Sequence, residues 1–206
     1  VADKITTLPS GVDGGIRRID RAYDDLSRVQ FVSSYSDESG SSISNQVKHT
    51  FDGWGNIIKS EQAHGGAVGT GTPAVEYVFE EGASGSTAKY VRLNTIKYPN
   101  GREVSFGYQL EREDDDLLNQ VAVISDSSGF YARYFFTGAS RLTGRQTLGS
   151  ALDISLDRFG RVTNHGWEGE NSDDIWAYTY DRNSNRTTRE SANAASPTTT
   201  QDEAYT

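Results

Sequence analysis

The sequence of 206 residues contains no cysteine and no methionine, only four prolines and only three histidines. The absence of cysteine excludes a disulfide framework and cysteine-based zinc sites. No stretch is apolar enough to span a membrane or to act as a signal peptide, so we expect no membrane insertion. Hydrophobic residues make up 34% of the chain. This fraction is low for a compact globule with a large core.

Positive charge is also scarce. The chain has 20 Lys and Arg residues against 29 Asp and Glu residues, so its formal net charge is −9 and its pI is near 4.8. Such a balance argues against a nucleic-acid partner or an anionic membrane surface, both of which require basic side chains. A cationic partner or bound divalent ions are compatible with it. A soluble acidic surface is the simpler interpretation.

Residues with the chemistry of an active site or metal site occur without a matching pattern. The three histidines, His49, His64 and His165, lack the close spacing of metal ligands. The acidic run around 114–116 lacks the glycine and the closing glutamate of a calcium loop. We expect a helical turn or solvated loop there, with a weak calcium site as a minor alternative. The sequence therefore predicts no enzyme, no catalytic residue, no metal and no cofactor.

What the chain has instead is 21 glycines, 11 tyrosines and a repeated frame. The frame begins with an aromatic or large apolar residue, followed by Asp in four copies and by Thr137 in the copy at Phe136. It continues through a short polar turn to Arg or Asn and returns to strand-like residues. Its five occurrences begin at Tyr23, Phe51, Phe136, Leu156 and Tyr180. A fixed recurrence of this kind is typical of repeat proteins. Short strands between Gly, Asn, Asp and Ser turns predict β-hairpins.

Each part of the frame has a mechanical interpretation. The Asp can accept hydrogen bonds from the backbone of the turn. Gly55 and Gly160 can adopt the positive φ of a tight turn, with Asn185 one place later in its own copy. The leading ring can anchor in a packed layer, and the stem of the following Arg can lie over it.

The frame resembles the YD repeat of the Rhs family, which reads approximately Tyr-Asp-x-x-Gly-Arg-Leu. Residues 98–108 are similar to the companion segment of that family, and residues 123–129 are similar to its Asp-x-x-Gly connector. The matches extend from Tyr23 to the C-terminus. We assign structural roles to the following motif residues: Tyr23, Asp24, Arg28, Phe51, Asp52, Gly55, Tyr98, Gly101, Arg102, Phe136, Arg141, Asp157, Gly160, Arg161, Tyr180, Asp181 and Arg186.

The resemblance implies an all-β fold of consecutive antiparallel hairpins that form a curved, coiled sheet, part of a shell or solenoid. We expect a lead-in at 1–22 and a repeat region at 23–206, degenerate at 65–120 and regular at 121–190. The sequence ends where the next Tyr-Asp would begin, so we expect an internal piece of a longer array. Toxin-associated members carry an Asp-Pro-x-Gly self-cleavage signature. This sequence contains no Asp-Pro, so no catalytic residue is transferred.

The function implied by the resemblance is structural: a segment of a secreted or cell-surface bacterial protein, within a shell, stalk or filament. Its partners would be adjoining repeats or identical chains, and a shell would enclose a toxin-like polypeptide cargo. The alternative is an adhesin-like module that recognises a glycan or a protein through Trp54, Trp167 and Trp176. For these three rings we favour packing in an inner layer of the sheet over exposure.

Overall fold

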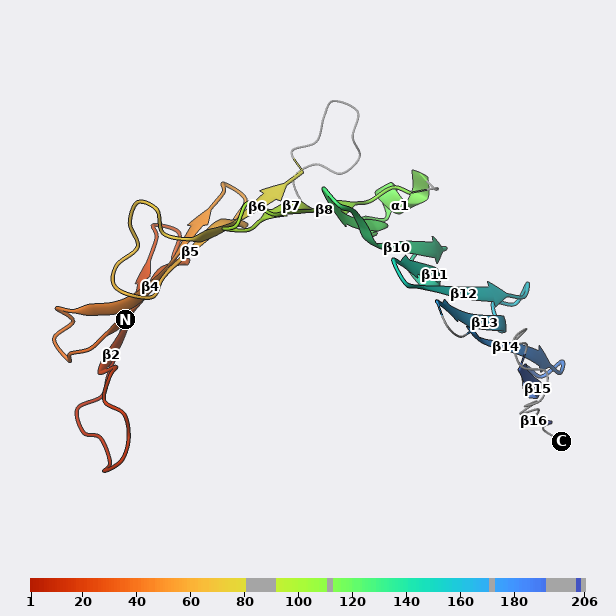
Figure 1. The fold of residues 1–206 in the computed structure, drawn as a ribbon, viewed down its shortest axis with the longest axis horizontal. Coiled ribbons are helices and arrows are strands. Elements are labelled where there is room, and N and C mark those ends of the chain that lie inside the picture. The colour runs from red at the N-terminus through yellow and green to blue at the C-terminus, as the bar shows by residue number, and fades with distance from the viewer. Residues whose placement is uncertain (81–91, 111–112, 171–172, 192–202, 205–206) are drawn as a thin grey trace. The chain divides into compact units, whose positions relative to one another are not determined.

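The chain forms one long antiparallel sheet. The computed structural model describes residues 1–206 except 81–91, 111–112, 171–172, 192–202 and 205–206. Within that part, sixteen strands lie side by side in the order of the sequence (Figure 1). Each pairs with its sequence neighbours, because alternating side chains and short polar turns favour local hairpins. The predicted all-β class of consecutive antiparallel hairpins is confirmed.

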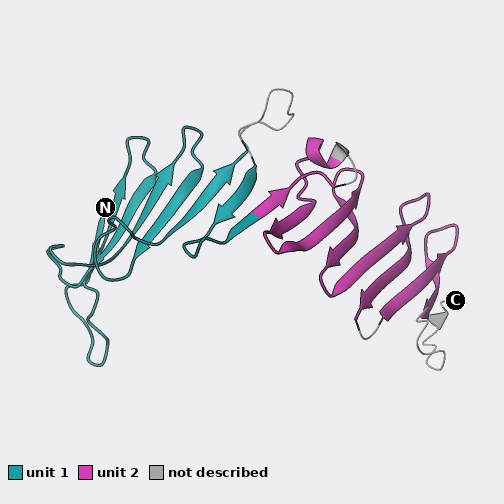
Figure 2. Ribbon diagram, turned by 45° about the horizontal axis from the view of Figure 1, so that its top comes forward, with its two compact units in different colours: residues 1–104 teal, residues 105–206 magenta. Residues whose placement is uncertain are grey.

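The chain divides into two compact units, residues 1–104 and 105–206, which Figure 2 shows in different colours. The strands of the first unit are β1 (Ala2–Lys4), β2 (Arg18–Tyr23), β3 (Val29–Tyr35), β4 (Ile43–Phe51), β5 (Ile57–Ala63), β6 (Ala74–Phe79) and β7 (Leu93–Lys97). Strand β8 (Glu103–Gly107) contains the boundary between the units. The predicted division at residue 22 concerns repeat content and stays a prediction.

The second unit continues with β9 (Val123–Asp126), β10 (Gly129–Thr137), β11 (Arg141–Thr147), β12 (Ser150–Leu156), β13 (Val162–Gly169), β14 (Asp173–Tyr180), β15 (Arg186–Ser191) and β16 (Glu203–Ala204). Its one described helix, α1, spans Glu113–Leu117, so part of the acidic run forms the helical alternative. The Asp pair at 173–174 begins strand β14. No described helix is long and apolar enough to cross a membrane.

In the described part of each unit, few hydrophobic side chains are buried. Among the described residues, only four hydrophobic side chains are buried: Val104, Tyr108, Ala122 and Ala132. The expectation that rings anchor in a packed layer is wrong for Tyr23 and Trp54, which are 45% and 74% exposed. The physical reason is that each unit is a single layer of strands (Figure 2), so rings at its corners have no second sheet to pack against. Cross-strand pairs must then supply much of the stability.

All five frames share an irregularity in strand register. In each, the leading residue pairs with the residue six positions later, for example Tyr23 with Val29 and Tyr180 with Arg186. One residue of the returning strand is then left over before regular pairing resumes. These extra residues are Gln30, Ile58, Thr143, Thr163 and Thr187. Such β-bulges increase the local twist and bend the strand that carries them, so every frame introduces the same local deformation.

Candidate functional site

The motif residues gather at the corners, which are the turns between consecutive strands. Four of these corners have the same turn geometry. At the first, the N–H of Ser27 donates to the carbonyl of Asp24 at 2.9 Å, and the N–H of Asp24 donates to the carbonyl of Arg28 at 2.9 Å. Ser27 has a φ of 62°. A three-residue loop closed by a residue with positive φ is a common hairpin connection. The same bonds recur at the corners that begin with Asp52, Asp157 and Asp181.

The positive φ falls on the fifth frame position in every one of these corners. Gly55 and Gly160 occupy it with φ values of 95° and 78°, as the frame predicts. In the last corner Ser184 takes this place with a φ of 67°. The expectation that Asn185 would adopt positive φ is therefore wrong. The turn requires positive φ at the fifth frame position, whichever residue type stands there.

The corner carboxylate holds its turn with both oxygens. Oδ1 of Asp157 accepts the backbone N–H groups of Phe159 at 2.8 Å and Arg161 at 2.9 Å. Oδ2 accepts Nε of Arg161 at 2.7 Å. The corner at Asp24 has the same bonds, with Arg28 as the side-chain donor at 2.7 Å. The carboxylate therefore replaces the water that exposed turn amides would otherwise bind.

Two members of this arrangement are missing from the motif residues that were assigned from the sequence, although the frame allows Asn in place of Arg. Asn56 donates its side-chain amide to Oδ2 of Asp52 at 2.9 Å, and Asn185 does the same to Asp181 at 2.9 Å. Asn185 thus occupies the position that was assigned to Arg186. The guanidinium of Arg186 instead lies 5.6 Å from the ring of Tyr178. The signal was available in the spacing, since Arg28, Asn56, Arg161 and Asn185 all follow their Asp by four residues.

Two arginines also join successive corners. Nη1 of Arg161 donates to the backbone carbonyl of Asp181 at 3.0 Å, and its guanidinium lies 4.7 Å from the centre of the Tyr180 ring. In the first unit, Arg28 reaches the carbonyl of Asp52 at 3.2 Å and lies 4.4 Å from the Phe51 ring. In an antiparallel meander, every second turn lies at the same end of the strands, about 10 Å from the previous one. The side chain of an arginine spans this distance, and the shorter side chain of an asparagine does not.

The remaining two motif corners depart from this pattern. Thr137 stands where the frame has Asp, and the positive φ there moves to Gly138 at 60°. Phe136 stacks on Tyr134 with ring centres 6.4 Å apart. Arg141 still reaches the next corner. Its Nη1 lies beside Gly160, 3.0 Å from the position that a Cβ on this glycine would occupy. This corner therefore keeps the reach toward its neighbour without the carboxylate.

The companion corner at 98–102 has the same turn shifted by one residue. Tyr98 takes the place of the Asp, its N–H donating to the carbonyl of Arg102 at 2.8 Å, and Gly101 has a φ of 81°. The guanidinium of Arg102 lies 6.0 Å from the Tyr98 ring. This turn joins β7 to β8, so it lies at the opposite ends of the strands from the turns that follow β2 and β4.

The corner bonds lower the pKa of all four carboxyls. For Asp24 the largest cause is the backbone N–H of Arg28, and for Asp181 it is the side-chain amide of Asn185. At Asp52 and Asp157 desolvation is the largest single effect and raises the pKa, but the hydrogen bonds together outweigh it. A general acid or base works best with a pKa near the working pH. These carboxylates are therefore suited to holding turns and not to proton transfer.

The three tryptophans lie in different surroundings. Trp54 is exposed beside an open groove of about 430 Å³ lined by Ile58, Tyr77 and Phe79 among others. Trp167 and Trp176 are half-buried on adjacent strands of the second unit, each with a guanidinium over its ring. Those of Arg145 and Arg189 lie 5.0 Å and 3.7 Å from the respective ring centres. Nε1 of Trp176 also donates to Asp174 at 2.6 Å.

Metal ligands do not cluster in the described part of the chain, where no group of three or more His, Asp or Glu side chains could hold an ion. His49, His64 and His165 belong to strand β4, the loop after β5 and strand β13. For the acidic run, the side chain of Asp114 lies outside the described residues. The motif residues therefore form a series of turn-closing contacts and not a pocket of reactive groups.

Comparison with known proteins concerns the fold. No protein-family model matches the sequence, and no curated protein matches it. Among solved structures, 90% of the chain superimposes on part of the Tc holotoxin pore of Photorhabdus luminescens carrying the mutation TccC3-D651A, with a TM-score of 0.51 and 13% identity. A TcdB2-TccC3 crystal structure without the hypervariable C-terminal region matches 86% of the chain, with a TM-score of 0.53 and 9% identity.

The chain spans only 9% of the length of each of these solved chains. At such low identity the likeness shows the fold and nothing finer. The chain therefore has the sheet architecture of part of these toxin-complex proteins, which supports the Rhs-like fold that the repeat frame predicts.

Proposed function

We propose that the chain is a non-enzymatic structural segment of a secreted or cell-surface bacterial YD-repeat protein. Its sheet continues into adjoining repeats and forms part of the wall of a shell that encloses a polypeptide cargo. The solved structures that share its fold are toxin complexes by their descriptions, which is consistent with such a role. Two other assemblies of the same sheet, a stalk and a filament of identical chains, are less well supported by these likenesses.

The observation that carries this proposal is the linkage of one corner to the next. Arg28 and Arg161 each bind their own Asp and also the backbone and ring of the following corner. A protein that must extend as a single layer cannot rely on a core, so contacts between nearest neighbours have to hold each hairpin in place. The same linkage occurs in both units, which fits a wall built by repetition.

The proposal is tested by cryo-electron microscopy of the full-length gene product that contains this chain. We expect the sheet to continue with further hairpins at the outer edges of both β1 and β16, and to surround density for a second polypeptide. A second measurement is limited proteolysis, in which the enclosed segment should be cleaved only after the wall is denatured. Cleavage of the enclosed segment before the wall is denatured, or a sheet that stops at β1 and β16, would contradict the proposal.

A second candidate function is adhesin-like binding of a protein through the Trp54 groove. The favourable observation is the exposure of Trp54 beside Tyr77 and Phe79. The acidic groups at this groove are already engaged, Asp52 by its turn and Glu80 by Arg92. The other side chains that line the groove are mainly apolar or aromatic. Large aromatic side chains dominate the binding energy at protein interfaces.

This candidate is tested by measuring how the fluorescently labelled chain binds to the surface of cultured cells. We expect Trp54→Ala to lower binding at least tenfold, because the substitution removes the most exposed ring that lines the groove. Leu148→Ala is a matched control, since Leu148 is 75% exposed in the second unit and does not line this groove. Equal loss in both variants, or no binding by the unmodified chain, would exclude the candidate.

A further inference from the structure

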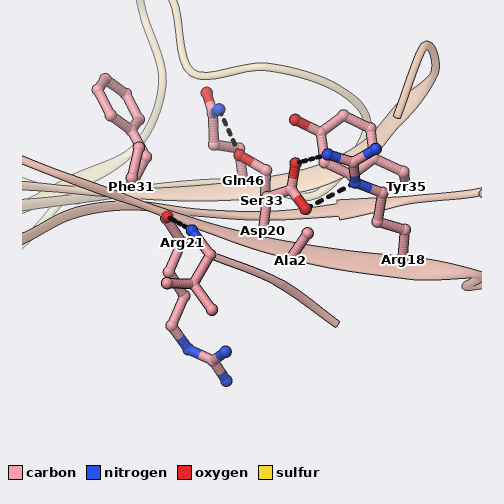
Figure 3. A pocket seen from close by; sticks show the side chains of 10 residues that line it. Ala2, Arg18, Asp20, Arg21, Phe31, Ser33, Tyr35 and Gln46 are labelled. Atoms are coloured by element: carbon pink, nitrogen blue, oxygen red, sulfur yellow. Dashed lines mark hydrogen bonds and ion pairs between the residues drawn. The ribbon is translucent and has the colours of Figure 1, made fainter. Parts of the chain in front are cut away.

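A pocket in the first unit combines polar side chains from three strands on one face of the sheet. Its volume is about 340 Å³. Asp20 of β2 pairs with Ser33 of β3, and Ser33 pairs with Gln46 of β4, so the three residues form one row across the strands. Figure 3 shows their side chains on the same side of the strands, with the Arg21 side chain pointing to the other side. We refer to Arg18, Asp20, Phe31, Ser33, Tyr35 and Gln46 as the polar cradle.

Rows of different character flank this central one. Arg18 pairs with Tyr35 on one side, and the guanidinium of Arg18 lies 5.6 Å from the Tyr35 ring. On the other side, Ala22 pairs with Phe31. The pocket thus has a polar floor with a ring at each end, as Figure 3 shows for Phe31 and Tyr35. Small-molecule sites commonly combine apolar walls with a few placed polar groups, and the volume lies at the lower end of their usual range.

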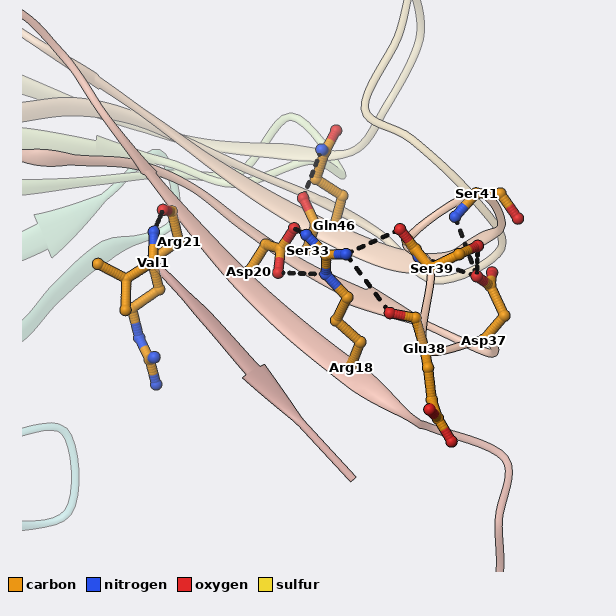
Figure 4. A network of polar contacts seen from close by, with 11 residues as sticks. Val1, Arg18, Asp20, Arg21, Ser33, Asp37, Glu38, Ser39, Ser41 and Gln46 are labelled. Atoms are coloured by element: carbon orange, nitrogen blue, oxygen red, sulfur yellow. Dashed lines mark hydrogen bonds and ion pairs between the residues drawn. The ribbon is translucent and has the colours of Figure 1, made fainter. Parts of the chain in front are cut away.

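The ion pair of the cradle is held in place by its own bonds. Arg18 donates Nε and Nη2 to the two oxygens of Asp20 at 2.7 and 2.6 Å, a bidentate pairing. Its Nη1 donates to the backbone carbonyl of Ser39 at 2.7 Å. The loop that carries Ser39 is ordered by Asp37, which accepts the backbone N–H groups of Gly40 at 2.8 Å, Ser41 at 3.1 Å and Ser42 at 2.7 Å. Figure 4 shows the bond from Ser41.

The amide of Gln46 is fixed in the same way. Its Nε2 donates to Oγ of Ser33 at 2.8 Å, and its Oε1 accepts the backbone N–H of Val68 at 2.9 Å (Figure 4 shows the first of these). Ser33 is only 4% exposed. A site whose side chains are already held by such bonds loses little conformational entropy when a ligand binds.

The cradle nevertheless keeps unused hydrogen-bonding capacity. The hydroxyl of Ser33 accepts from Gln46, and no hydrogen bond among the described residues uses its own proton. Gln46 has a second amide proton, and each Asp20 oxygen can accept more than the one bond from Arg18. The row therefore offers acceptors at Asp20 and donors at Ser33 and Gln46. A buried polar group with an unused donor favours a ligand that can accept from it.

Charge restricts which ligand would fit. Arg18 and Asp20 neutralise each other, and the nearby Arg21 is paired with Asp3 at 2.7 Å. Two further cations lie at the rim: the Val1 ammonium, which donates to the carbonyl of Arg21 at 2.9 Å, and Lys48, whose Nζ lies 5.8 Å from the Phe31 ring and 3.7 Å from Glu61. An anion would meet the carboxylate of Asp20, and a cation would meet the guanidinium of Arg18, so neither gains from the site. A hydroxyl group can donate to a carboxylate and accept from an amide or hydroxyl at once. The C–H face of a sugar ring can in turn lie against an aromatic ring such as Phe31.

We propose that the polar cradle binds a neutral sugar ring, with hydroxyl groups of the sugar bonded to Asp20, Ser33 and Gln46 and its apolar face against Phe31. The site is distinct from the corners and from the Trp54 groove. Because the pocket is small and open, the dissociation constant for one ring is on the order of 1 mM.

The test is ligand-observed NMR on the 206-residue chain, with methyl β-glucopyranoside, methyl β-galactopyranoside and N-acetylglucosamine as separate probes. We expect at least one probe to bind, and glucuronate to bind at least tenfold more weakly. Ser33→Ala and Gln46→Leu should each weaken binding at least tenfold. Circular dichroism establishes that each variant is folded, and Phe31→Leu is an additional variant that keeps the polar row intact.

Matched controls locate the site. Gln62→Leu makes the same chemical change on an exposed residue of β5 that pairs with Val47 and so faces the other side of the sheet. Together with Trp54→Ala, it should leave the affinity unchanged. Absence of binding by all three neutral probes, equal or stronger binding of glucuronate, or loss of binding in Trp54→Ala with retention in Gln46→Leu would each overturn the proposal.

Discussion

At the scale of single residues, the corner aspartates explain why the frame has its spacing. A carboxylate can satisfy two backbone amides and one side-chain donor only if these lie two and four residues further along. The residue four positions after the Asp must carry a side-chain N–H, which both Arg and Asn supply. The residue three positions after the Asp must tolerate positive φ, which Gly does without strain and Ser does at some cost.

Gly160→Ala tests the requirement for positive φ. Gly160 has a φ of 78°, and an added Cβ would lie 3.0 Å from Nη1 of Arg141. We expect a loss of about 1 to 2 kcal/mol in unfolding free energy from backbone strain. The measurement is urea denaturation of the intact chain, with the unfolding of the second unit monitored by the fluorescence of Trp167 and Trp176.

The matched control is Gly149→Ala. A Cβ added to Gly149 would meet no heavy atom within 4 Å, and the φ of this residue is not positive. This variant should be neutral or slightly stabilising, because it only restricts the unfolded chain. If both variants had the same stability, the turn would not depend on the backbone conformation of Gly160.

The corner carboxyls also predict how stability depends on pH. Their pKa values are lower in the folded chain than the ordinary value of an Asp. The ionised form therefore stabilises the fold. This contribution is fully present above the unfolded pKa of about 3.9 and is lost as the pH falls through the lower folded pKa. We expect the melting temperature to be level from about pH 7 to about pH 5 and to fall below about pH 4.

The variant for this prediction is Asp157→Asn combined with Asp181→Asn, measured by thermal denaturation across the same pH range. It should melt at a lower temperature at neutral pH and lose less stability on acidification. Asp153→Asn on strand β12 is the control, because Asp153 is exposed and is not a corner residue. An unchanged acid slope in the double variant would show that other carboxyls govern acid unfolding.

At the scale of the hairpin, the unit of assembly is a corner together with the arginine of the corner before it. Arg161 binds Asp157 through Nε and reaches the carbonyl of Asp181 through Nη1. The planar fork of a guanidinium can make both bonds in one conformation, and a lysine ammonium cannot. The corners at Asp52 and Asp181 receive such a contact, and their own Asn side chains bond to the Asp of the same corner.

Arg161→Lys tests this linkage while keeping the charge. We expect a loss of about 1 kcal/mol in the unfolding free energy of the second unit, from weakened cation–π contact and hydrogen bonding. The measurement is a double-mutant cycle with Tyr180→Leu, in which the two changes should not be additive. Arg158→Lys is the control, since Arg158 is an exposed neighbour in the same corner. Additive effects in the cycle would mean that Arg161 does not act through Tyr180.

At the scale of the whole molecule, few side chains are buried and contacts are made between neighbouring strands. The four buried hydrophobic residues among those described all lie between positions 104 and 132. Stability in such a chain is approximately a sum over neighbouring elements, so parts of it can open without the rest. This differs from a globular domain, in which a shared core couples all elements.

Native-state hydrogen exchange should reveal this local opening. We expect the amides of residues 1–104 and those of 105–206 to exchange through two separate openings, each with its own denaturant dependence. Mass spectrometry of peptides from each unit makes the measurement. Gly160→Ala is the internal comparison, because it should raise exchange in the second unit and leave the first unchanged. A single opening free energy for the most protected amides of both units would exclude this view.

Much of the architecture was predictable from sequence because its determinants are local. Alternation over 43–51 and a turn after Phe51 are sufficient for a hairpin, and β4 and β5 form one. The frame also placed Gly55 and Gly160 correctly at positive φ. These features depend on a few adjacent residues, whose backbone preferences act before any distant contact forms.

Other features required the register between strands. The link from Arg28 to Asp52 joins residues 24 positions apart, and no periodicity in the sequence indicates it. The polar cradle depends on Asp20, Ser33 and Gln46 lying in one row, which a shift of one residue would separate. Exposure of Trp54 depended likewise on the absence of a second layer.

The amino-acid sequence by itself therefore determined the hairpins, their turns and their order along the chain, because these arise from short-range backbone and side-chain preferences. Only the tertiary structure decided which corner each arginine reaches, which rings stay exposed and which polar side chains share a face. Those properties depend on how strands are aligned across the sheet, and that alignment is set by many weak pairings acting together.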